Sequence, residues 1–149
     1  MTNKTKIELA LEFGHSMHEL RIFLRQYIQV RIKEHGVNIT FEMLEVLSFL
    51  WKKDGANQQE IADMTLRDKS SMTYLIDNLV KRNMVKRVED ENDRRNKLIF
   101  LTNEAKALKE QLHPWVAEVY EKATVNINAD TIEAAQDLIS AMVKNLKAD

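Results

Sequence analysis

Residues 84–102, Met-Val-Lys-Arg-Val-Glu-Asp-Glu-Asn-Asp-Arg-Arg-Asn-Lys-Leu-Ile-Phe-Leu-Thr, are the one stretch of this sequence with a β-strand pattern. Residues 84–89 and 97–102 are the two strand-like runs. The residues between them, Asp90 to Asn96, are all polar, which is typical of a turn. The stretch therefore predicts a β-hairpin with a charged tip, and we expect no other strands in the chain.

The composition of the 149-residue chain favours helix elsewhere. It has three Gly, one Pro and 44% hydrophobic residues, and so few turn-forming residues argue against an all-β fold. The absence of cysteine excludes a disulfide framework, a thiol redox switch and a cysteine nucleophile. We see no secretory signal and no uncharged run near the roughly 18 residues of a membrane span, so we expect a cytoplasmic protein without a membrane partner.

Apolar residues recur at three- and four-residue steps in six segments, which predicts six helices. The first runs from about residue 6 to 34 and ends at Gly36. Thr40, Asn57 and Asp68 suit the N-caps of the next three, which end near residues 52, 64 and 83. The last two cover residues 102–126 and the segment that follows Asn128.

The predicted elements follow the order of a winged helix-turn-helix: a helix, a short helix, a further helix and a charged hairpin. We therefore predict a mainly α (α+β) fold with long N- and C-terminal helices and one β-hairpin wing. The helix after Asp68 has one apolar stripe, and its other side is small and polar, which lets a helix approach base edges closely. The candidate DNA contacts on this helix are Lys69, Ser70, Ser71, Thr73, Tyr74, Asn78 and Lys81.

The hairpin tip supplies two further candidates, Arg94 and Arg95, whose side chains are long enough to enter a minor groove. Asp93 is placed to hold one of them in a bidentate ion pair. Residues 66–97 hold nine basic and six acidic residues in a chain of net charge −1, which suits a phosphate-facing module. Asp77 is unfavourable beside phosphates unless it pairs with Lys81 or accepts from cytosine. Each feature, taken alone, also fits an ordinary solvated surface.

These residues resemble the MarR family of bacterial transcription regulators. Residues 93–102, Asp-Arg-Arg-Asn-Lys-Leu-Ile-Phe-Leu-Thr, match the family's wing pattern of Asp-x-Arg followed by five residues and Leu-Thr. Leu79-Val-Lys-Arg-Asn-Met-Val is similar to the end of the family's recognition helix, with Asn83 in place of the usual Gly. Gln59-Glu-Ile-Ala is similar to the helix before it. The specific motifs cover about residues 55–102, and the helix order matches throughout.

The resemblance implies a homodimer that grips a pseudo-palindromic operator in double-stranded DNA, with Asp93 and Arg95 as the wing pair and Arg95 in the minor groove. It implies major-groove contacts from Ser70, Ser71, Thr73 and Tyr74, although a basic residue is common where Tyr74 stands. It also implies a small-molecule inducer pocket between the dimerisation and DNA-binding parts, often for anionic aromatic compounds. Our leading hypothesis is a ligand-responsive, sequence-specific DNA-binding repressor; the sequence leaves open whether the ligand releases DNA and whether the regulator activates instead.

Wide apolar faces on the end helices support dimerisation independently of the resemblance. A winged module of about 65 residues is too small to cover three such helices, whereas two interlocking copies do so. We expect residues 1–36 and 103–149 to form a helical dimerisation region, and residues 37–102 to form the DNA-binding domain.

Two weaker patterns lie outside the hairpin and its neighbours. A metal-binding helical protein or a metal-responsive regulator is an alternative. Its candidate ligands are Glu12, His15 and His18, with Glu19 or His113, and their spacing lets two of them ligate one metal. His18, Arg21, Arg25 and Trp51 are candidates for a carboxylate-binding inducer pocket. We expect no cofactor and no enzyme activity, since the chain has no Gly-rich phosphate loop, no His-Glu-x-x-His and no nucleophile elbow.

Overall fold

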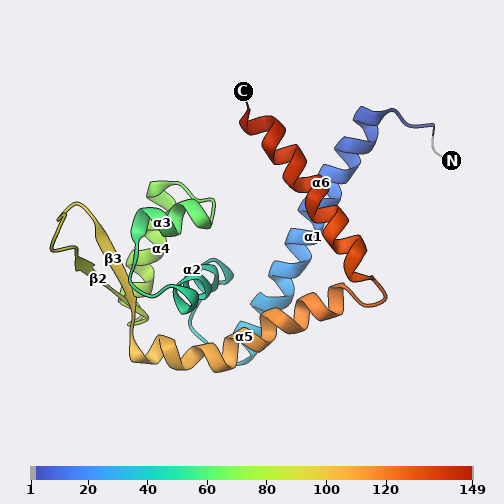
Figure 1. The fold of residues 1–149 in the computed structure, drawn as a ribbon. Coiled ribbons are helices and arrows are strands. Elements are labelled where there is room, and N and C mark those ends of the chain that lie inside the picture. Colours follow the sequence, from blue (N-terminus) through green and yellow to red (C-terminus); the bar gives the residue numbers. More distant parts are fainter. Residues whose placement is uncertain (1–2, 149) are drawn as a thin grey trace.

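The computed structural model describes residues 3–148, which form six helices and a small sheet that lies at one end of the molecule (Figure 1). In chain order the elements are α1 (Lys6–Glu34), α2 (Phe41–Lys52), β1 (Ala56–Asn57), α3 (Gln58–Met64), α4 (Lys69–Lys81), β2 (Val85–Glu89), β3 (Lys97–Leu101), α5 (Asn103–Ala123) and α6 (Ala129–Lys147). The predicted mainly helical winged helix-turn-helix fold is confirmed.

The helices begin where the sequence predicts, and α1 to α4 also end there, whereas α5 ends at Ala123 rather than near residue 126. Thr40, Asn57 and Asp68 each accept a backbone N–H of the first turn of α2, α3 and α4, which satisfies a donor that the helix leaves unpaired. Gly36 and Asn83 have φ of +66° and +57°. Glycine and asparagine tolerate this left-handed conformation best, so both residues end their helices efficiently.

The sheet has three antiparallel strands in the order β1-β3-β2. Val85 lies opposite Leu101, and Glu89 lies opposite Lys97, so β2 and β3 form the expected hairpin. The expectation of only two strands is wrong, because Ala56 and Asn57 pair with Ile99 and Leu98 on the other edge of β3. A strand of two residues has no periodicity, and only its pairing with β3 defines it.

The turn before β1 fixes this sheet to α2. Asp54 Oδ1 accepts from the backbone N–H of Leu101 at 2.8 Å, and the Gly55 N–H donates to the Ile99 carbonyl at 2.9 Å. Gly55 has a φ of +75°, and a Cβ placed on it would lie 2.6 Å from a ring atom of Phe100. Both observations require glycine at this position.

One core joins the winged domain to α5 and to the second half of α1. Its buried residues run from Leu24, Ile28 and Ile32 through α2, α3, α4 and β3 to Leu112, Trp115 and Val119. Polar contacts follow the same path: Trp51 Nε1 donates to the Ala105 carbonyl at 3.1 Å, while Tyr27 and Arg31 both donate to Glu118. The winged module is therefore attached to two long helices through apolar and polar contacts.

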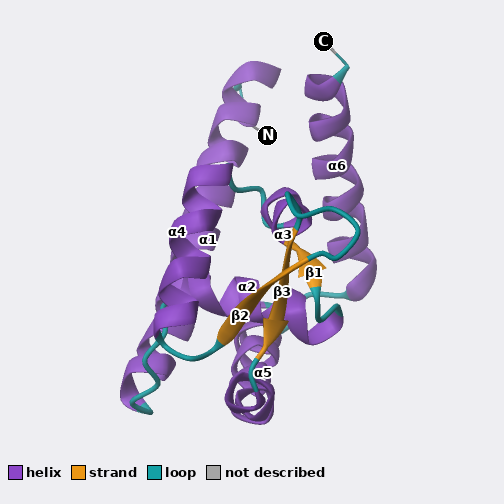
Figure 2. Ribbon diagram, turned by 90° about the vertical axis from the view of Figure 1, so that its left-hand side faces the viewer, coloured by secondary structure: helices purple, strands orange, loops and turns teal. Residues whose placement is uncertain are grey.

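The first half of α1 and all of α6 stand outside this core. Among the described residues α6 has none that is buried, and Figure 2 shows α1 and α6 standing apart with their free ends pointing the same way. Large apolar side chains lie exposed along both helices: Ile7, Leu11, Leu20 and Phe23 on α1, and Ile132, Leu138, Ile139, Val143 and Leu146 on α6. In residues 3–148 we find no helix with the length and apolarity that crossing a bilayer demands.

Gly55→Ala tests the turn that holds the sheet. We expect it to lower the free energy of unfolding by about 1–3 kcal/mol, because alanine is strained at this φ and its Cβ meets the Phe100 ring. Gly14→Ala is the matched control: nothing lies within 4 Å of its Cβ position in α1, so it should be neutral or stabilise the helix by up to about 1 kcal/mol. Chemical denaturation measures both, and equal stabilities would refute this role of Gly55.

Candidate nucleic-acid interface

The rotation of α4 about its axis is fixed by one buried stripe. Met72, Leu75, Ile76 and Leu79 are all buried, and the N-terminus of the helix is held by Asp68, whose Oδ1 accepts the Ser71 N–H at 2.7 Å. With the apolar stripe turned inward, the opposite stripe must face outward. The packing thus exposes the polar face that the sequence singles out.

The predicted contact residues of α4 lie on this outward face. Lys69, Ser70, Thr73, Tyr74 and Lys81 are exposed, and Ser71 and Asn78 are half-buried. Tyr74 is the largest of them, with 68% of its surface exposed. A row of short hydroxyls and one aromatic ring on a free helix face has the shape and the donors needed to meet base edges in a major groove.

Two residues of this row already have partners within the protein. The Thr73 hydroxyl donates to the Lys69 carbonyl at 2.9 Å and accepts from Gln58 Nε2 at 3.1 Å. Asn78 Nδ2 donates to the Tyr74 carbonyl at 2.8 Å, and its Oδ1 accepts from Arg82 at 3.2 Å. Their capacity to bond a base is smaller than the sequence suggests, since these local bonds use most of it.

The wing tip is a tight turn that presents two arginines. The Asn96 N–H donates to the Asp93 carbonyl at 2.9 Å, and Asp93 Oδ1 accepts the Arg95 N–H at 3.1 Å. Arg94 is exposed, and the Arg95 side chain is 93% exposed. A side chain that protrudes this far is free to enter a groove.

The expected bidentate pair between Asp93 and an arginine does not form. Arg95 Nε alone approaches Asp93 Oδ1, at 3.4 Å. The carboxylate instead organises the turn through the Arg95 backbone N–H, which is an Asx-type contact. Below the tip, Lys97 Nζ donates to Glu89 at 3.0 Å and joins the two strands of the wing.

Asp77 has a partner that sequence reasoning missed. The partner of Asp77 is not the expected Lys81. Asp77 Oδ1 instead lies 2.6 Å from an Nη of Arg87, on β2. The only sequence signal for this pair is the position of Arg87, which the strand pattern of residues 84–89 places on the side facing α4. The pair removes the electrostatic objection to a carboxylate on this face.

A second feature is a hollow of about 670 Å³ between α1, α2, the α3–α4 turn and α5. Its wall is apolar at Leu24, Ile28 and Phe49, and Arg21, Glu45 and Arg67 provide its charges. Of the candidate pocket residues, Arg21 lines this hollow, whereas His18, Arg25 and Trp51 are not among its lining residues.

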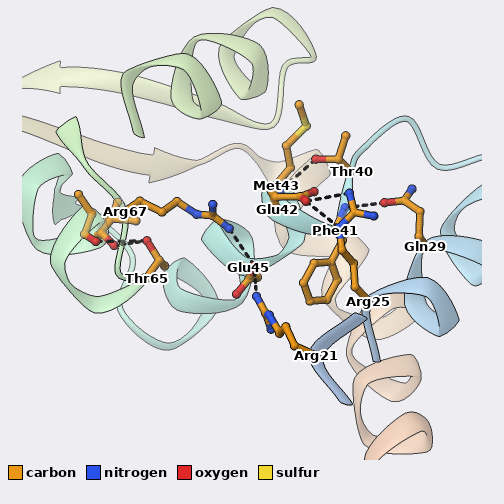
Figure 3. A network of polar contacts seen from close by, with 12 residues as sticks. Arg21, Arg25, Gln29, Thr40, Phe41, Glu42, Met43, Glu45, Thr65 and Arg67 are labelled. Carbon is orange, nitrogen blue, oxygen red and sulfur yellow. Dashed lines mark hydrogen bonds and ion pairs between the residues drawn. The ribbon is translucent and has the colours of Figure 1, made fainter. Parts of the chain in front are cut away.

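Figure 3 shows how charges meet in this region. Glu45 Oε1 of α2 accepts from Arg21 of α1 at 2.8 Å and from Arg67, in the turn before α4, at 2.9 Å. Arg25 pairs separately with Glu42 at 2.8 Å. Burial raises the pKa of Glu42, but the hydrogen bond and charge of Arg25 outweigh burial and leave that pKa below its ordinary value. Glu45, whose role no sequence pattern indicated, thus bridges the long helix and the turn that leads into α4.

The residues of the metal alternative do not gather within the described part of the single chain. In residues 3–148 no three His, Cys, Asp or Glu side chains are close enough to hold a metal ion. Glu12 pairs with Lys4 at 2.6 Å, and His15, His18, Glu19 and His113 are all exposed. The Glu/His spacing on α1 therefore reads as a solvated helix face.

The chain is similar in sequence to known transcription regulators. Residues 39–97 match the model of the MarR family. The chain is 26% identical over 125 residues to the HTH-type transcriptional regulator MhqR of Bacillus subtilis, which covers 83% of this chain and 84% of that protein. It is 30% identical over 77 residues to the multiple antibiotic resistance protein MarR of Escherichia coli, covering 51% of this chain and 54% of that protein.

The fold is also that of a solved protein–DNA complex. The structure of reduced AbfR bound to DNA superimposes with a TM-score of 0.81 at 19% identity, over 97% of this chain and 99% of that one. The match of the family model to residues 39–97 covers α2, β1, α3, α4, β2 and the wing tip, and it ends at the first residue of β3. The chain is thus similar to the MarR family of transcription regulators over residues 39–97, and it has the winged helix-turn-helix fold of the DNA complex along almost its whole length.

Proposed function

We propose that this protein is a sequence-specific DNA-binding regulator that binds a pseudo-palindromic operator as a homodimer and represses transcription until a small ligand binds. The observation that carries the proposal is the exposed polar face of α4 beside an exposed arginine tip, both fixed by one buried core. AbfR, which shares this fold, was solved bound to DNA. We infer a cytoplasmic location from this role.

In this proposal α4 enters the major groove and the wing enters the adjacent minor groove. Ser70, Ser71 and Tyr74 contact base edges, while Lys69 and Lys81 contact phosphates. Thr73 and Asn78 contribute mainly by keeping this face rigid, because their side chains are bonded internally. Arg94 and Arg95 supply the minor-groove and phosphate contacts of the wing, with Asp93 shaping its turn.

The dimer that we propose is formed by residues 1–36 and 103–149 of two copies, with residues 37–102 of each copy on one half-site. The support is the pair of uncovered apolar faces on α1 and α6, since exposed apolar surface of this extent marks an interaction site. A second copy also doubles the phosphate contacts, which favours binding by a protein of net charge −1.

The ligand that we propose is an anionic aromatic compound in the hollow lined by Arg21. Apolar walls with a few convergent charges are typical of such sites. Because Arg21 and Arg67 share Glu45, an anion that binds Arg21 competes with Glu45 and alters the contact at the turn before α4. A change at this turn is a direct route from the ligand to the DNA-binding helix.

Arg95→Ala should weaken binding to an operator selected from random duplexes by about 1–3 kcal/mol while the fold survives, because it removes the most exposed cation of the wing. A fluorescence titration with labelled operator measures the loss, and thermal unfolding checks the fold. Lys52→Ala, which removes an exposed cation at the end of α2 outside the proposed DNA contacts and the dimerisation region, is the control. Wild-type affinity in Arg95→Ala would show that the wing tip does not bind DNA.

Leu138→Glu should convert the dimer to monomer, since it places a charge on the exposed apolar face of α6 without touching the core. Light scattering after size exclusion should give twice the chain mass for the wild type and the single chain mass for the variant. Val88→Glu, at a similarly exposed apolar residue of the wing, should stay dimeric. A wild-type monomer would contradict the dimer outright.

Arg21→Gln should make operator binding insensitive to an aromatic carboxylate such as benzoate or a hydroxylated relative. Because it also removes the Arg21–Glu45 hydrogen bond, the variant should bind the operator more weakly than the wild type when no ligand is present. In the wild type such a compound should release labelled operator at concentrations that leave Arg21→Gln bound, because the variant lacks the cation that receives the carboxylate. Equal release from both proteins would place the ligand elsewhere.

A further inference from the structure

The guanidinium of Arg87 meets two helices from one position on the wing. An Nη lies 2.6 Å from Asp77 of α4, Nε donates to Gln58 of α3 at 3.2 Å, and the other Nη donates to the Thr73 carbonyl at 3.4 Å. Gln58 closes the set, since its Nε2 donates to the Thr73 hydroxyl at 3.1 Å. We call these four residues the Arg87 cluster.

The sheet explains why Arg87 reaches both helices. Arg87 lies opposite Ile99 of β3, and Ile99 lies opposite Ala56 of β1, two residues before Gln58. Arg87 therefore extends across the sheet toward the start of α3, while α4 lies alongside β2 (Figure 1). The planar guanidinium has donors on both sides, and here all three nitrogens are used.

We propose that Arg87 is a positioning residue that couples the wing to α4, so that the two elements bind DNA as one unit. The wing is a two-stranded ribbon that extends away from the core, and its tip is exposed. A short turn, residues 82–84, joins α4 to β2, and the Arg87 cluster adds a polar connection between a side chain of β2 and the outward face of α4. The inference rests on the proposed DNA-binding function.

The cluster is poorly suited to a purely stabilising role. Arg87 and Asp77 side chains are 28% and 48% exposed, and an ion pair at such exposure contributes little to the free energy of unfolding. The position of the Arg87–Asp77 ion pair matters more than its contribution to the free energy of unfolding. Asp77 follows Tyr74 by one helical turn on the face proposed to meet DNA, and there an unpaired carboxylate would repel phosphates.

Asp77→Asn distinguishes a positioning role from a purely electrostatic one, because the two predict opposite changes in operator affinity. If charge alone mattered, removing a carboxylate beside DNA would tighten binding to every sequence. If the cluster positions α4 and the wing, operator affinity falls about tenfold while affinity for a random duplex stays the same or rises. Glu60→Gln is the matched control: it removes one carboxylate of the same domain, paired with Lys53 rather than with the wing, and operator affinity should not fall.

Arg87→Lys gives a second variant with unchanged net charge. Lysine retains a cation near Asp77 but lacks the planar set of donors that bonds Gln58 and Thr73. We expect weaker operator binding with little change on the random duplex, and a thermal unfolding midpoint close to the wild type. Should Asp77→Asn fail to fold, Arg87→Lys answers the same question.

The decisive readout is a double-mutant cycle with the wing tip. In the wild type Arg95→Ala should cost about fivefold to 150-fold in operator affinity. In the Asp77→Asn or Arg87→Lys background this penalty should shrink to about twofold, because a loosened wing no longer places Arg95 in its groove. An undiminished Arg95 penalty, or wild-type operator affinity in both cluster variants, would overturn the inference. Failure of the wild type to prefer any duplex would instead refute the proposed function.

Discussion

The burial of one side of α4 is the constraint on which the rest of the site depends. Met72, Ile76 and Leu79 are completely enclosed, and exposing a single one of them costs about 1.5–3 kcal/mol. The helix therefore has no freedom to rotate about its axis, and the row from Ser70 to Lys81 faces outward. Specific recognition of base edges requires this fixed rotation, because a small turn of the helix would present different side chains.

The same core connects distant parts of the chain to α4. Ile28 and Ile32 of α1 and Leu112 of α5 are buried in it, so both long helices pack against the winged domain. Glu45 adds a polar link, because it holds Arg21 of α1 and Arg67 of the turn before α4 at once. A ligand that acts on this link has a short physical path to the DNA-binding face.

Much of the fold follows from local sequence patterns. Several predicted features depend on only a few neighbouring residues each, and all of them hold in the structure. They are the caps at Thr40, Asn57 and Asp68, the left-handed Asn83 and the strand pattern of residues 84–102. The third strand could not be predicted, because two residues acquire strand character only by pairing with β3. Local patterns are informative because secondary structure is specified by short-range periodicity and capping.

The arrangement of charged side chains could not be predicted in the same way. The exposed residues of α4 and the wing tip were visible from spacing, whereas the pairs Asp77–Arg87 and Glu45–Arg67 require the packed arrangement of several elements. Asp77 illustrates the difference: sequence alone offered Lys81 one turn away, and the structure supplies Arg87 from another strand. Competition among several possible partners is decided by tertiary geometry, which sequence spacing does not contain.

Footprinting of the protein on a selected operator tests the central claim most directly, because it records both elements at once. Hydroxyl-radical cleavage combined with methylation protection should show two protected major-groove patches whose centres lie about one helical turn, or a multiple of it, apart. Each patch should adjoin a protected minor-groove segment that becomes cleavable with Arg95→Ala. A single patch without symmetry, or minor-groove protection that is indifferent to Arg95, would contradict the account of paired subunits that each bind with a helix and a wing.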